Sequence, residues 1–182
     1  MWFYYSTGVA ADIFGGDAIN NSEQYTRGLE HANNTSAILN LVTFLFAFSI
    51  PFWVSKLGKK LTHTVCLLIG GTGLISVNFI HEPWMLYVSM SMVGIAWSSI
   101  LAMPYSMLAG SIPQEKMGIY MGIFNFCIVL PEILASLFFG KIMDNFLHND
   151  RLLAVLIGGL LLCTAAVVCA LIVREKSNAP EV

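Results

Sequence analysis

Two long stretches without a charged side chain constrain this chain more than any other feature. Residues 84–110 contain no Asp, Glu, Lys or Arg, and residues 152–173 contain none either. A helix rises about 1.5 Å per residue, so about 20 apolar residues cross the ~30 Å hydrocarbon core of a bilayer. Both stretches are long enough to do so, which predicts an all-α transmembrane protein.

The composition supports a lipid environment and gives no sign of other classes. Hydrophobic residues make up 57% of the chain and charged residues 11%, against about 25% charged in a typical soluble domain. The net charge of −2 and the lack of a basic run predict no nucleic-acid partner. The four cysteines lie in apolar segments without a Cys-x-x-Cys pair, so we interpret them as small buried hydrophobes; no metal or cofactor is expected.

The chain divides into six hydrophobic segments: residues 1–14, about 36–56, 62–80, 84–110, 117–140 and 152–173. The first would form only about 21 Å of helix, too short to cross, so we expect the chain to begin within a transmembrane helix. Residues 15–35, rich in asparagine and charged side chains, are predicted as an extracytoplasmic loop. Residues 174–182 are predicted as a cytoplasmic tail.

Lys and Arg in the links indicate the orientation. If the segments alternate in direction, six of these residues lie on one side of the membrane and three on the other. The richer side faces the cytoplasm in membrane proteins. We therefore expect an integral protein of the bacterial cytoplasmic membrane, with the C-terminus inside.

Polar residues in four of the segments recur at helical spacing, seven residues apart in three of them and four then three in the other, which puts each set on one helix face. The sets are Tyr5 and Asp12; Ser36, Asn40 and Thr43; Ser91, Ser98 and Tyr105; and Asn125 and Glu132. This pattern predicts a water-accessible cavity lined by four helices, with the other two packed outside. Separately, Gly118-x-x-x-Gly122, Gly70-Gly71 and Gly158-Gly159 predict close helix contacts.

Glu132 is the only acidic residue deep within a full-length segment. A charge at the centre of a membrane helix costs about 2.5–3.5 kcal/mol on insertion scales, so we expect Glu132 to face the cavity and to have a role there. One interpretation is a proton carrier or a group that binds sugar hydroxyls. The other is a neutral carboxylic acid bonded to a neighbouring helix.

Five residues are candidates for substrate binding: Trp97, Ser98, Tyr105, Asn125 and Asn40. The amide of Asn125 suits hydroxyl groups because it both donates and accepts hydrogen bonds. Trp97 and Tyr105 have rings that can stack on a sugar. Interhelical hydrogen bonding for Asn125 and simple packing for the two aromatic residues stay open as alternatives.

The link after residue 51 carries Lys56, Gly58, Lys59 and Lys60, and it resembles the cytoplasmic motif of the major facilitator superfamily. Pro51 and Ser55 depart from that motif. The lysines are interpreted as topological anchors that contact lipid headgroups or helix ends. The stretches GIAWSSILAMPY (94–105) and GIYMGIFNFCIVLP (118–131) resemble the sucrose/maltose–proton symporter branch of the same superfamily.

The resemblance covers residues 1–173 and implies the C-terminal six-helix bundle of a twelve-helix carrier, with its first helix truncated. It implies proton symport of a disaccharide or related sugar by alternating access, with an N-terminal half as partner. Glu132 departs from the glutamine usual in that branch. A non-transporting sugar sensor or scaffold, and a carrier of a non-sugar solute, remain the alternatives.

No enzyme is expected. His81-Glu82-Pro83-Trp84-Met85 begins like a zinc-protease motif, but Met85 stands where the second histidine belongs. Neither a Gly-x-Ser-x-Gly elbow nor a phosphate-binding loop occurs. The four histidines are expected in loops or at segment ends, where they cannot converge within the membrane.

Overall fold

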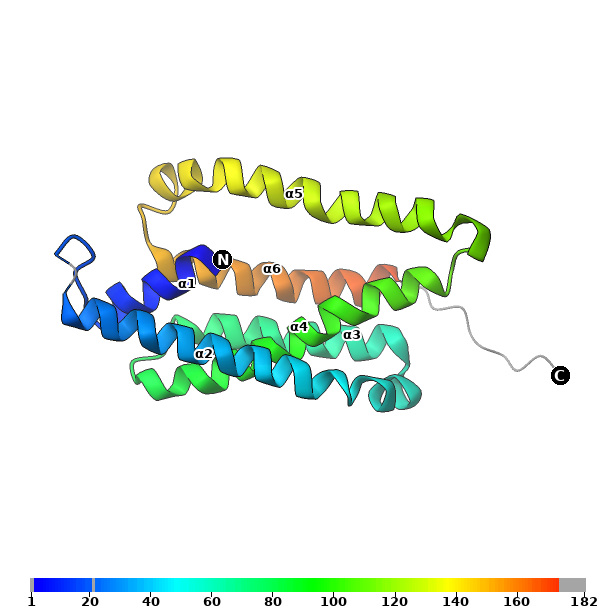
Figure 1. Cartoon of the computed structure of the whole chain (residues 1–182), viewed down its shortest axis with the longest axis horizontal. Coiled ribbons are helices and arrows are strands. Elements are labelled where there is room, and N and C mark those ends of the chain that lie inside the picture. Colours follow the sequence, from blue (N-terminus) through cyan, green and yellow to red (C-terminus); the bar gives the residue numbers. More distant parts are fainter. Residues whose placement is uncertain (1, 21, 174–182) are drawn as a thin grey trace.

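The computed structural model describes residues 2–20 and 22–173, and over these residues the chain is helical with no strand (Figure 1). The predicted cytoplasmic tail, 174–182, lies outside the described residues. The elements are α1 (Trp2–Gly8), the π-helix η1 (Val9–Ile13), α2 (Glu23–Ala47), α3 (Ile50–Val77), the 3-10 helix η2 (Pro83–Met85), α4 (Leu86–Ala109), the 3-10 helix η3 (Gln114–Lys116), α5 (Met117–Asn145) and α6 (Arg151–Ile172).

Four of the described helical segments are long and apolar enough to cross a membrane: Ile50–Val77, Pro83–Ala109, Gln114–Asn145 and Arg151–Ile172. This fits an integral membrane protein. The two uncharged stretches that the sequence predicted as spans correspond to α4 and α6 within two residues at each end. The sequence predicted five full-length membrane spans, and four helical segments of the described structure are long and apolar enough. The predicted span that does not qualify is the one that falls on α2.

α2 begins well before the predicted segment. Ser22 caps it by accepting a hydrogen bond from the backbone N–H of Tyr25 at 3.2 Å, and Glu23 pairs with Arg27 one turn later at 2.6 Å. The predicted loop over 15–35 is therefore wrong from Glu23 onward. Because the first half of α2 carries these polar side chains, α2 does not qualify as a span.

The predicted continuous segment over 36–56 is also wrong, because the chain turns within it and turns again just after it, at Gly58. α2 ends at Ala47, and α3 starts at Ile50 after a short turn. Within α3, Gly58 has φ 80° and ψ 164°, a left-handed conformation that glycine adopts without steric cost. Residues 50–57 thus form a short helix at one end of the molecule, and the long part of α3 starts only after Gly58 (Figure 1).

The packed body, which we define as α1, η1, α2, α3, α4 and α6, is held together by small residues. A Cβ added at Gly71 would lie 2.4 Å from Cys163 Sγ, and one at Gly159 would lie 2.9 Å from the carbonyl oxygen of Gly71. A Cβ at Gly70 would lie 2.2 Å from Cβ of Ala96. The predicted close contacts at Gly70-Gly71 and Gly159 are confirmed, and they bring α3 against both α4 and α6.

α5 stands apart from the packed body (Figure 1). Met143, near its end, is its only buried residue in the described structure. A Cβ added at Gly118 or Gly122 would meet nothing within 4 Å, so the close contact predicted from their spacing is wrong. α5 is instead joined to the rest near its two ends.

Candidate functional site

A hydrogen bond between two predicted substrate residues joins α4 to α5. The hydroxyl of Tyr105 donates to Oδ1 of Asn125 at 2.7 Å. The Tyr105 ring also meets the ring of Phe124 edge-on, with centroids 5.1 Å apart. Tyr105 is 36% exposed and Asn125 is exposed as well, so the pair lies on an accessible surface.

This pair retains capacity to bind hydroxyl groups. The amide nitrogen of Asn125 has two N–H donors, and it makes no hydrogen bond within the part of the chain that the structure describes. The adjoining rings of Tyr105 and Phe124 offer apolar faces beside those donors. Donors next to an aromatic surface are what a ring bearing hydroxyl groups requires.

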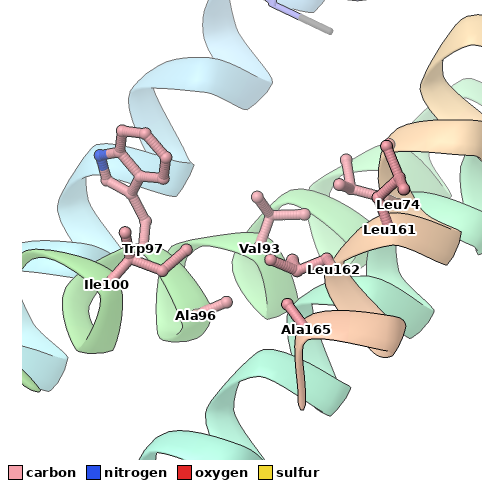
Figure 2. Close-up of a pocket in the computed structure, with 9 residues that line it drawn as sticks. Leu74, Val93, Ala96, Trp97, Ile100, Leu161, Leu162 and Ala165 are labelled. Atoms are coloured by element: carbon pink, nitrogen blue, oxygen red, sulfur yellow. The ribbon is translucent and has the colours of Figure 1, made fainter. Parts of the chain in front are cut away.

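The other predicted substrate residues occupy different surroundings. Trp97 lines a cavity of about 330 Å³ between α3, α4 and α6 (Figure 2). Ser98 is 3% exposed, and its hydroxyl has no hydrogen-bond partner among the described residues. Asn40 is exposed on α2, and its amide donates to the carbonyl oxygen of Ser36 at 3.0 Å. Hydrogen bonding thus unites two of the five predicted residues.

Glu132 is exposed on α5, nearly two turns beyond Asn125 and on the same helix face. Its carboxyl group makes no hydrogen bond or ion pair within the described residues. The interhelical bond that the sequence left open for this residue is therefore not formed in this structure.

The lysines of the predicted cytoplasmic motif lie at the end of the body where α4 finishes. Lys59 Nζ donates to the carbonyl oxygen of Ser106 at 3.0 Å, in the last turn of α4. The same carbonyl oxygen accepts a hydrogen bond from the backbone N–H of Gly110 at 3.2 Å, and a cation at this helix end complements the helix dipole. Lys56 Nζ lies 4.3 Å from the centre of the Phe52 ring. Gly58, with its positive φ, makes the turn within α3. Lys60 is half-buried. The predicted contact of this cluster with a helix end is confirmed at Lys59.

Buried polar pairs within the body were missed at the sequence level. His63 is buried in α3, with Nδ1 2.8 Å from Oγ of Ser99 in α4. Tyr5, predicted on the cavity face, is 1% exposed and bonds Thr35 across to α2 at 2.7 Å. These side chains face packed neighbours, so polar residues on a helix face did not by themselves indicate a wet cavity.

One histidine contradicts the expectation that all four lie in loops or at segment ends. His31 lies within α2, with Nε2 2.8 Å from the carbonyl oxygen of Pro83. His31 also packs between the rings of Phe14 and Tyr87. The described residues contain no group of three His, Cys, Asp or Glu that could hold a metal ion.

Comparison of the chain with family models, with curated proteins and with solved structures finds no match.

Proposed function

We propose that this chain is the C-terminal half of a carrier of the major facilitator type, which moves a disaccharide or related sugar together with protons. The observation that supports this best is the exposed pair of Tyr105 and Asn125. It places unused amide donors beside aromatic faces where two predominantly apolar helices meet.

The loose attachment of α5 supports alternating access as the mechanism. In such carriers, whole bundles rock around a substrate held near the midplane between them. α5 buries only Met143 among its described residues, so most of this helix can shift with little loss of packing. The Tyr105–Asn125 contact ties α5 to α4, so a ligand that competes for Asn125 would alter how α4 and α5 are joined.

Glu132 is proposed as the proton-coupling group. It lies on the same face of α5 as Asn125, and it has no described partner that would hold its proton or charge for a structural reason. Protonation would let the carboxyl group face a water-filled path without the cost of a charge in the membrane.

Uptake by the reassembled carrier tests the proposal. The chain is co-expressed with the N-terminal half of a sugar–proton symporter, reconstituted in vesicles and given a pH gradient with labelled sucrose or maltose. We expect uptake that a protonophore abolishes, and no uptake above empty vesicles for the chain alone. Sugar binding without flux would favour a sensor instead, and the absence of both would overturn the sugar assignment.

Variants in the same assay test the assigned roles. Asn125→Leu should lower uptake at least tenfold, since it removes the donors. Tyr120→Phe is the matched control, because the Tyr120 hydroxyl on α5 makes no hydrogen bond in the described structure. Glu132→Gln should retain sugar exchange but lose the acceleration by a pH gradient; an unchanged pH response would remove the proton role.

A further inference from the structure

A short helix at one end of the molecule carries an exposed cation among aromatic side chains. Residues 50–57 form this helix, which we call the end helix, and Gly58 turns it out of line with the long part of α3 (Figure 1). Ile50 is buried, whereas Phe52, Trp53 and Lys56 are exposed. The end helix therefore has a buried side and an exposed side.

The end helix lies at the level of the membrane surface. The 19 residues of α3 from 59 to 77 rise about 28 Å, close to the ~30 Å thickness of the hydrocarbon core, which puts Gly58 at one boundary of that core. Lys59, at the same boundary, bonds the carbonyl oxygen of Ser106 in the last turn of α4, so α4 ends at this level too. A helix that turns away from α3 here lies among the lipid headgroups.

The exposed side of the end helix holds its cation beside two rings. Lys56 Nζ lies 4.3 Å from the centre of the Phe52 ring, and the Trp53 ring meets the Phe52 ring edge-on with centroids 5.6 Å apart. Lys56 makes no hydrogen bond or ion pair within the described residues. Its ammonium group has three N–H donors, so it can bind phosphate oxygens while it stays over the ring.

The charge in this part of the chain is positive. Lys56, Lys59 and Lys60 follow one another within five residues, and the sequence has no Asp or Glu from residue 31 to residue 81. The link between α4 and α5, at the same end of α4, adds no net charge because Glu115 is followed by Lys116. Positive charge favours an anion. Tryptophan is enriched where a membrane meets water, so the rings favour an anion that a lipid carries over one that is dissolved.

We propose that the exposed side of the end helix binds the headgroup of an anionic phospholipid. Lys56 binds the phosphate, and Phe52 and Trp53 lie against the upper part of the acyl chains. The lysines of this link then have different roles, since Lys59 serves the end of α4 and Lys56 serves the lipid. The inference goes beyond the proposed transport function and does not depend on which solute is carried.

Quenching of Trp53 fluorescence measures which lipid lies beside the end helix. In the full chain, Trp2, Trp84 and Trp97 are replaced by phenylalanine, so that Trp53 is the only tryptophan. The protein is reconstituted in vesicles of phosphatidylglycerol and phosphatidylcholine, in which one lipid or the other carries bromine on its acyl chains. At equal mole fractions, we expect phosphatidylglycerol to occupy the site at least threefold more often than phosphatidylcholine.

One charge-removing variant tests the residue assignment. Lys56→Gln should lower this occupancy ratio at least twofold, because it removes the cation and leaves an exposed side chain of similar length. Lys141→Gln is the matched control, since it removes the same charge from an exposed position on α5 and should leave the ratio unchanged. Native mass spectrometry of the chain with all four tryptophans gives a second measurement. There Lys56→Gln, and not Lys141→Gln, should at least halve the number of phosphatidylglycerol molecules that stay bound.

Three outcomes would overturn the proposal. Equal quenching by the two lipids would mean that acyl chains cover this side without regard to headgroup charge. A ratio that Lys56→Gln leaves unchanged would exclude Lys56 as the phosphate ligand. A ratio that inorganic phosphate abolishes, and chloride at equal ionic strength does not, would mean that a dissolved anion is the preferred occupant. Neither measurement involves uptake, so this proposal can fail while the transport proposal stands, and the reverse.

Discussion

α5 is at least as apolar as α3 and α4 of the packed body, yet α3 and α4 are packed and α5 is not. In the body, glycines bring backbones together, as where Gly159 lies against Gly71 and Ile75. In α5, Gly118, Gly122 and Gly140 have open space where a Cβ would point. In a membrane, apolar side chains gain little by leaving lipid for protein, so close backbone approach and hydrogen bonds decide which helices associate. The two regions contain glycine at a similar frequency, and they differ in whether another helix packs against those glycines.

Replacing glycines by leucine should give the largest difference in unfolding free energy between the packed body and α5. Gly159→Leu places new atoms about where Ile75 and the Gly71 carbonyl already are, so we expect a loss of about 3 kcal/mol of unfolding free energy. Gly122→Leu meets open space and should change stability by less than about 1 kcal/mol, from helix propensity alone. Denaturation with SDS followed by circular dichroism measures both. Equal losses for the two variants would mean that α5 is packed in solution.

Long uninterrupted apolar runs could be predicted from the sequence, and glycine turns and pairings between helices could not. The bounds of α4 and α6 follow from the lack of charges over residues 84–110 and 152–173. The turn at Gly58 depends on a positive φ that the surrounding residues do not require, and the polar start of α2 becomes helical because Ser22 caps it.

The candidate site was predictable only in part, for a similar reason. Helical spacing put Tyr105 on one face of α4 and Asn125 on one face of α5. Which faces meet depends on packing, and packing also turned Ser98 and Tyr5 into the body. A polar residue on a helix face is compatible with a wet cavity or with a buried hydrogen bond, and sequence spacing does not distinguish them.

Two neighbouring serines of α4 allow a comparison of the stability effect of a buried hydroxyl that has a hydrogen-bond partner with that of one that has no described partner. Ser99→Ala leaves His63 without its bond to the Ser99 hydroxyl, which should cost about 1–3 kcal/mol. Ser98→Ala removes a buried hydroxyl that has no described partner, so it should be neutral or stabilising. The same SDS titration measures the two variants side by side. If Ser98→Ala lowers stability more than Ser99→Ala does, the Ser98 hydroxyl has a hydrogen-bond partner outside the described residues.

A smaller effect is expected where α5 meets α4. Tyr105→Phe removes the hydrogen bond to Asn125 and keeps the ring contact with Phe124, so global stability should fall by only about 0.5 kcal/mol. Hydrogen exchange followed by mass spectrometry should nevertheless show that the first half of α5 exchanges faster in the variant, whereas exchange in α3 is unchanged. Tyr120→Phe controls for loss of a hydroxyl from the same helix region. Unchanged exchange in Tyr105→Phe would show that other contacts hold α5 in place.

The smallest effect concerns the turn that leads into α2, at the edge of the packed body. The carboxylate of Asp17 accepts hydrogen bonds from the backbone N–H of Ile19 at 2.8 Å and from the Asn20 amide at 2.5 Å. The bond from the Ile19 N–H, followed by the one from Asn20, lowers the pKa of Asp17 below its ordinary value. Since the folded pKa lies below that of the unfolded chain, about 3.9, this stabilisation is present above that pH and is lost as the pH falls through the lower folded value. Exchange of the amides at the start of α2 should therefore be protected more weakly at pH 3 than at pH 6, after correction for intrinsic rates. Asp17→Asn should flatten that dependence while α5, which carries no such turn, responds identically in both proteins. A pH response that survives in Asp17→Asn would assign it to an acid outside this turn, because Asp17 is the only acidic residue of the sequence from 14 to 22.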